Sequence, residues 1–167
     1  MGEFETLDDT RLTSVGLLFE TAASLRRIFE QRFETENRLS GQSFDVLIRL
    51  ARTPGHRLRM SELADQASLS PSGLTRAADR LADEGLMTRQ VCPEDRRGAF
   101  AVLTPKGEEL MNRAVPDHIA HIDEVLTGVL TPEEEQVLTE LLRRLRDHLH
   151  GSGSACGLVA DGRCPGA

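Results

Sequence analysis

Apolar residues recur at helical spacing near the start of the chain. They stand at Leu12, Val15, Phe19, Ala22, Leu25, Phe29 and Phe33. Because this spacing returns an apolar residue to one side of a helix every three or four positions, it predicts a helix over 12–33, about six turns long. Such a helix carries a longer apolar stripe than a small domain can cover alone, so we expect a partner surface against it.

Two further segments show a helical pattern. Over 43–52 the apolar positions are Phe44, Leu47, Ile48 and Ala51, and Pro54-Gly55 follows as a helix end. Later in the chain, Thr104-Pro105 has the sequence of a helix start, with threonine as the N-cap and proline in the first turn. Pro116 falls inside this helix and is expected to kink it.

The last predicted helix starts at Thr131-Pro132-Glu133-Glu134, where the glutamate three residues after the threonine indicates a capping box. Its apolar side holds Val137, Leu138, Leu141, Leu142, Leu145 and Leu149. Residues 151–167 contain five glycines and no hydrophobic period, so we expect a disordered tail there. Apolar-faced helices at both ends of the chain suggest packing against a second copy, as in a two-fold dimer.

The middle of the chain predicts two short helices joined by a tight turn. Ser61 is placed to cap a helix over 62–67, and Ser68-Leu69-Ser70 forms the turn. Ser70 then caps a second helix, in which Pro71 presets the first φ angle. The buried stripe of this second helix is predicted at Leu74, Ala77, Ala78 and Leu81.

The opposite face of the second helix carries chemistry suited to duplex DNA. It presents Ser72, Gly73, Thr75, Arg76, Asp79 and Arg80. Small residues in the first turn allow close approach to base edges, hydroxyl groups can bond bases or phosphates, and the guanidinium of Arg76 can bind guanine. Free N–H groups at the helix start also favour phosphate. The alternative is an ordinary amphipathic helix with a solvated polar face.

A β-hairpin is predicted directly after this helix. Gly85 ends the helix, 86–91 and 99–103 have strand-like sequences, and 92–98 form the turn between them. The turn holds Arg96 and Arg97 beside Asp95. An arginine at a hairpin tip can enter the narrow, negative minor groove, although a charged tip can equally be only solvated.

Charge is distributed unevenly along the chain. The net charge is −7, yet residues 49–97 hold nine arginines against seven acidic residues. The segments before and after are both acidic, so the only positive segment coincides with the predicted DNA reader. The surplus is too small for bulk charge to explain DNA binding, and the placement of individual arginines must matter.

Several classes of function are disfavoured by the sequence. Glycine-rich phosphate loops, G-x-S-x-G and H-E-x-x-H are missing, so we expect neither an enzyme nor a cofactor. The absence of Trp and Tyr argues against an aromatic platform for single strands. The sequence contains no run of 18 apolar residues, so a membrane span is not expected. The acidic first ten residues lack a signal-peptide core, and we therefore expect a cytoplasmic location.

The central segment resembles the MarR family of winged helix–turn–helix regulators. The resemblance rests on RMSELADQASLSPSGLTRAADRLADEGLMTR and on PEDRRGAFAVLTPKG, which contain Asp95-Arg96-Arg97 and the L-T-x-x-G ending at 103–107. It implies a mainly α fold with a small β-hairpin wing. Its organisation would be an acidic extension over 1–9, a helical dimerisation region over 10–40 and 105–150, a winged helix–turn–helix over 41–104, and the tail over 151–167.

The resemblance also implies a function and a set of site residues. It implies a homodimeric transcriptional regulator, usually a repressor of a palindromic operator, which a small ligand or oxidation releases from DNA. The DNA-contacting residues carried over are Ser70, Ser72, Thr75 and Arg76 on the second helix and Arg97 on the wing, with Arg96 touching the backbone.

The effector is open at this point. Many members bind phenolic anions, which Arg26, Arg49 or His56 could meet here, although each can also be a solvated or structural residue. Oxidation of Cys92 on the wing is an alternative. Zinc bound by histidines and cysteines, such as His118 with His121 or those near the C-terminus, is another. A winged-helix protein-interaction module without specific DNA binding is the competing function.

Overall fold

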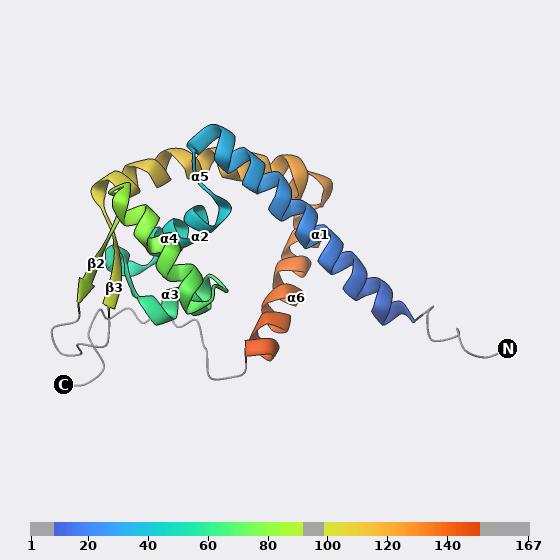
Figure 1. Ribbon diagram of the computed structural model, residues 1–167. Helices are drawn as coiled ribbons and strands as arrows, with labels where there is room; N and C mark the ends of the chain where they lie inside the picture. The colour runs from blue at the N-terminus through green and yellow to red at the C-terminus, as the bar shows by residue number, and fades with distance from the viewer. Residues whose placement is uncertain (1–8, 92–98, 151–167) are drawn as a thin grey trace. The chain divides into compact units, whose positions relative to one another are not determined.

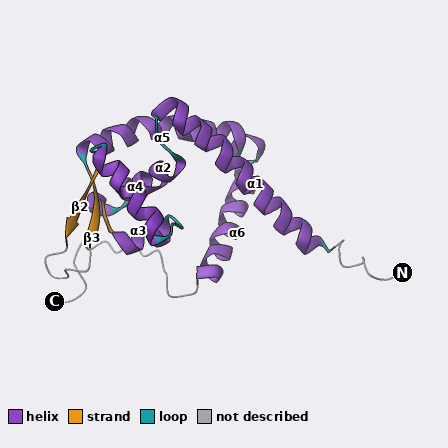
Figure 2. Ribbon diagram, viewed as in Figure 1, coloured by secondary structure: helices purple, strands orange, loops and turns teal. Residues whose placement is uncertain are grey.

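The computed structural model describes residues 9–91 and 99–150. The chain divides into two compact units between Gly41 and Gln42. Helices make up most of the described structure, and a small antiparallel sheet lies in the second unit (Figures 1 and 2). The predicted fold class, mainly α with a small β wing, is confirmed.

The first unit is dominated by helix α1 (Thr10–Arg32), which continues into a π-helical turn over Phe33–Asn37. Asp9 caps the helix, because its carboxylate accepts a hydrogen bond from the Arg11 backbone N–H at 2.9 Å. The Arg11 side chain bonds the same carboxylate, and together these contacts lower the pKa of Asp9. The helix predicted over 12–33 is therefore present.

The second unit carries the remaining elements, except that Gly41, the first residue of α2, belongs to the first unit. In chain order they are α2 (Gly41–Arg52), a 3-10 turn (Pro54–His56), β1 (Arg57–Arg59), α3 (Met60–Gln66), α4 (Pro71–Asp83), β2 (Met87–Val91), β3 (Ala99–Leu103), α5 (Pro105–Val125), a second 3-10 turn (Thr127–Val129) and α6 (Pro132–His150). The two helices of the predicted motif are α3 and α4, and the two predicted hairpin strands are β2 and β3.

The sheet has three strands in the order β1-β3-β2, all antiparallel. Ala101 in the central strand pairs with Leu58 on one side and with Arg89 on the other. The sequence predicted only the hairpin, because β1 is three residues long and is too short to show an alternating pattern. The added strand makes the base of the wing a sheet rather than an isolated hairpin, which would be marginal on its own.

The core of the second unit joins α2, α3, α4 and the sheet. Its most deeply buried side chains include Leu47, Leu50, Leu63, Leu74, Leu81 and Met87. The stripe predicted for α4 is buried throughout: Leu74, Ala77, Ala78 and Leu81 are each at most 2% exposed. The opposite face of α4 is therefore held outward by core packing.

Helix starts agree with the predicted caps at three places and differ at one. Ser70 and Thr104 cap α4 and α5, and the Thr131–Glu134 box caps α6. Ser61 is not a cap, because α3 begins at Met60, directly after strand β1 ends. The backbone N–H at Arg59 instead donates to Glu62 Oε2 at 3.4 Å.

Helix α5 continues through Pro116 as a single element, so the proline does not break it. The bend expected there stays a prediction. Among the described residues, no helix is both long and apolar enough to cross a membrane.

Candidate nucleic-acid interface

The N-terminal turn of α4 is built by a serine cap and a proline. Ser70 Oγ accepts a hydrogen bond from the Gly73 backbone N–H at 3.1 Å and lies 3.2 Å from Ser72 Oγ. Pro71 occupies the first helical position, where its fixed φ angle suits the helix and its missing N–H costs nothing. The Leu74 N–H bonds the Ser70 carbonyl at 2.9 Å, so the Ser72 N–H is the one left in this turn to donate to a phosphate.

Two larger side chains extend the same face by one turn. The hydroxyl group of Thr75 donates to the Pro71 carbonyl at 2.8 Å, so its oxygen remains an acceptor for a base amino group. Arg76 Nε contacts the Ser72 carbonyl at 3.4 Å. This contact uses Nε, and the two outer nitrogens of a guanidinium are the pair that can bind a base edge.

The structure thus brings together four of the six predicted DNA-contacting residues. Ser70, Ser72, Thr75 and Arg76 are all exposed and lie within the first two turns of α4. Arg96 and Arg97, together with Asp95 and Cys92, fall in 92–98 and lie outside the described residues.

One residue beside this face was not identified from the sequence. Arg89 on β2 places its Nη2 atom 2.8 Å from the backbone carbonyl of Thr75 and 2.9 Å from Asp79 Oδ1. The available signal was strand alternation: Arg89 is two residues after buried Met87 and so shares its face, toward α4. Asp79, which the sequence placed on the reading face, is therefore paired with the wing strand.

Two hydrogen bonds join the start of α5 to the end of α4. Thr104 Oγ1 donates to the Gly85 carbonyl and Lys106 Nζ to the Glu84 carbonyl, each at 2.7 Å. Gly107 is required by this close approach, because a Cβ atom there would overlap the Leu86 carbonyl oxygen. The L-T-x-x-G pattern is thus explained by contact between α5 and the chain that leaves α4.

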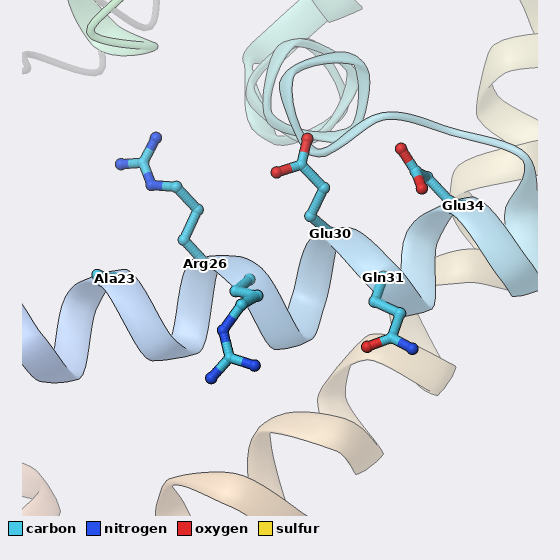
Figure 3. A pocket seen from close by; sticks show the side chains of 6 residues that line it. Ala23, Arg26, Glu30, Gln31 and Glu34 are labelled. Carbon is cyan, nitrogen blue, oxygen red and sulfur yellow. The ribbon is translucent and has the colours of Figure 1, made fainter.

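The three candidate effector-binding residues lie in different units. Arg26 belongs to the first unit, where it lines a depression on the α1 surface with Ala23, Arg27, Glu30, Gln31 and Glu34 (Figure 3). Arg49 and His56 belong to the second unit. Arg49 already pairs with Asp45 at 3.0 Å, and His56 lies at the end of a 3-10 turn with a φ of 54°.

The metal alternative gains no support from the described part of the chain. Groups of three or more His, Cys, Asp or Glu side chains arranged to hold a metal ion are not found in it. His118 on α5 packs edge-on against Phe44 with ring centroids 4.8 Å apart. Burial lowers the pKa of His118, and the charge of His121 lowers it further.

Comparison with known proteins gives a consistent result. The sequence model of the MarR family matches residues 39–98. The HTH-type transcriptional regulator MhqR of Bacillus subtilis is 38% identical over 86 residues, which are 52% of this chain and 59% of MhqR, so the match spans less than two thirds of that relative.

Solved structures extend the likeness along the chain. Sco3205, a MarR family transcriptional regulator from Streptomyces coelicolor solved in complex with DNA, is 30% identical with a TM-score of 0.80, covering 89% of this chain and 94% of that one. BpsR of Bordetella bronchiseptica, described with regulation of its DNA binding by 6-hydroxynicotinic acid, is 25% identical with a TM-score of 0.68, covering 80% and 99%. The winged helix–turn–helix geometry and these matches show that the chain belongs to the MarR family of transcriptional regulators, which are DNA-binding proteins rather than enzymes.

Proposed function

We propose that this regulator is a homodimeric repressor that binds a palindromic operator in the cytoplasm and leaves it when a small anionic ligand binds. The observation that carries the proposal is the exposed, capped start of α4, where Ser70, Ser72, Thr75 and Arg76 share one face beside the three-stranded wing. A helix with small residues in its first turn can enter the major groove closely enough for side chains to reach base edges.

The residues of this face have separable roles in the proposal. Ser70 and Ser72 bind phosphate together with the Ser72 N–H at the helix start, and they fix the depth and register of α4. Thr75 and Arg76 contact base edges and supply sequence preference. Arg97 enters the minor groove from the wing while Arg96 contacts the phosphate backbone.

Dimerisation through the helices of 10–40 and 105–150 is supported by apolar side chains that the single chain leaves exposed. On α1 these include Leu12 and Phe19, which are 56% and 68% exposed, and on α6 they include Leu141 and Leu145, at 47% and 51%. Large apolar side chains exposed along one side of a helix, as on each of these two helices, indicate an interaction site. A two-fold dimer would hold two α4 helices at a fixed separation, which a palindrome matches.

Release by an effector would act by changing that separation. BpsR, whose DNA binding is regulated by 6-hydroxynicotinic acid, supports an aromatic anion as the ligand class. Arg26, Arg49 or His56 is the candidate to bind its carboxylate or phenolate. An effector can shift the equilibrium only by binding the released form more tightly than the DNA-bound form.

The experiment that tests this function is a selection of duplexes from a random pool with the full chain. The expected product is an inverted repeat whose half-sites are about 10–10.5 base pairs apart, centre to centre, or a multiple of that. Arg76→Ala should lose the enrichment, whereas Arg113→Ala, on α5 and paired with Glu109, should keep it. A pool that shows no enrichment with the wild-type chain would favour a protein-interaction module instead.

A further inference from the structure

We infer that Arg89 is a positioning residue for DNA recognition, which ties the reading helix α4 to the wing strand β2 through Thr75 and Asp79. This inference deepens the proposed function and rests on it. It concerns a side chain that need not touch DNA and acts through the orientation of those that do.

The geometry is a single guanidinium nitrogen shared between two acceptors on α4. Arg89 Nη2 lies 2.8 Å from the Thr75 carbonyl and 2.9 Å from Asp79 Oδ1. Thr75 and Asp79 are four residues apart, so they lie one above the other on the same side of the helix. The two contacts together fix both the height and the rotation of this side of α4 against the strand.

Along α4, the contact with Arg89 lies beside the residues that are proposed to contact base edges. Core packing by Leu74, Ala77 and Ala78 holds the buried side of the helix, but nothing in that packing involves the exposed side. Thr75 is itself a proposed base contact, and Arg76 is the next residue. A small displacement of this exposed side of α4 would therefore move the base-contacting groups, although core packing still sets which face of the helix points outward.

The position along β2 links the same contact to the wing. Arg89 is two residues before Val91, the last residue of β2. Its backbone pairs with Ala101 on the central strand, so the guanidinium projects from a strand anchored within the sheet. Arg89 thereby joins the element proposed for the major groove to the element proposed for the minor groove.

The direction in which DNA affinity changes when the charge of Asp79 is removed tests the inference. An exposed carboxylate on a DNA-facing helix repels phosphate, so its removal should by itself strengthen DNA binding. If Asp79 instead holds Arg89 against α4, its removal should weaken binding to the operator. The pair is partly exposed, with the Arg89 and Asp79 side chains at 34% and 57%, and such pairs contribute little to stability. A loss of operator affinity would therefore occur without a matching loss of thermal stability.

The test compares Asp79→Asn, Arg89→Gln, the double variant and Asp79→Glu in the full chain. Binding to the selected operator and to a scrambled duplex is measured over a range of salt concentrations, with Tm for each variant. We expect Asp79→Asn and Arg89→Gln each to weaken operator binding about ten-fold, with little change on scrambled DNA, and the double variant to be no weaker than either single one. Asp79→Glu, which keeps the carboxylate, should recover most of the affinity.

Three outcomes would overturn the inference and leave the proposed function in place. Asp79→Asn binding the operator as tightly as the wild type, or more tightly, would show that the pair positions nothing. A loss confined to Arg89→Gln, with the salt slope reduced by about one, would show a direct phosphate contact. Equal losses on operator and scrambled DNA with a lower Tm would show a purely structural role. A wild-type chain that does not prefer the operator would overturn the proposed function itself, and the inference with it.

Discussion

The ammonium group of Lys106, in the first turn of α5, donates a hydrogen bond to the backbone carbonyl of Glu84 at the end of α4, 2.7 Å away. The neighbouring hydroxyl of Thr104 makes the equivalent bond to Gly85, whose φ of 70° turns the chain out of the helix. Both groups satisfy carbonyls that a helix end leaves without an intrahelical partner. The end of the reading helix and the start of α5 therefore form one structural joint.

Gly107 is the residue most sensitive to substitution in this joint. A Cβ atom there would overlap the Leu86 carbonyl oxygen and press on the Leu103 side chain, so Gly107→Ala requires backbone movement. We expect a loss of about 1–3 kcal/mol in the free energy of unfolding, measured by chemical denaturation. Gly16→Ala on α1 is the matched control, because a Cβ there meets open space and alanine favours the helix. An unchanged free energy of unfolding in Gly107→Ala would show that the backbone at this contact can move to make room for a Cβ atom.

The role of Ser70 as the cap of α4 can be tested by comparison with Ser61, which was wrongly predicted to cap α3. Ser70→Ala removes the acceptor for the Gly73 N–H and should cost about 1 kcal/mol of stability. Ser61→Ala is the control: Ser61 is exposed and does not cap its helix, so its change should stay within about 0.5 kcal/mol. Equal losses for the two variants would contradict the helix starts described above.

Hydrophobic spacing and cap residues were enough to predict most of the helices. The α4 stripe, the Thr104 start and the capping box at Thr131 follow from local interactions that the sequence displays directly. Strand β1 could not be predicted, because its pairing with β3 joins residues more than 40 positions apart and leaves no local pattern.

At the candidate site too, features set by local sequence could be predicted and those set by tertiary packing could not. Small residues after a serine cap identified the face of α4, because the cap and the helical period fix which side chains share a face. Arg89 was missed, because its partners Thr75 and Asp79 lie on another element and only tertiary packing brings them together. Sequence reasoning therefore found the groups proposed to touch DNA more readily than the group that holds them in place.

Stability should depend on pH through His118. Burial, with a smaller effect from His121, lowers the pKa of His118 below its ordinary value of 6.5. The unfolded chain then binds more protons than the folded one between the folded pKa and about 6.5. The contribution of His118 to the stability of the fold is therefore complete above pH 6.5. It is lost as the pH falls toward the pKa of His118 in the folded protein, and below that pKa the stability changes no further through this group.

Denaturation midpoints measured across this pH range should show that decrease. His118→Gln should flatten this part of the profile, whereas His148→Gln, on an exposed position of α6, should leave it in place. A profile that is unchanged in His118→Gln would assign the pH dependence to other groups.

Arg76 is expected to supply base preference rather than general affinity. Its substitution by alanine should cost about 1–3 kcal/mol of operator binding and relax the preference at one position in each half-site. The measurement is a competition between operator variants that differ at single base pairs. Uniform weakening across all of them would make Arg76 a phosphate contact.

The most direct test of the central claim compares three duplexes: the selected palindrome, the same duplex with one half-site scrambled, and a fully scrambled one. Affinity and stoichiometry are measured as salt is raised. Two chains should bind the palindrome, with affinity falling steeply with salt as counterions are released, and scrambling one half-site should sharply weaken binding. Equal affinity for all three duplexes, or binding by a single chain, would contradict recognition of a palindrome by paired α4 helices.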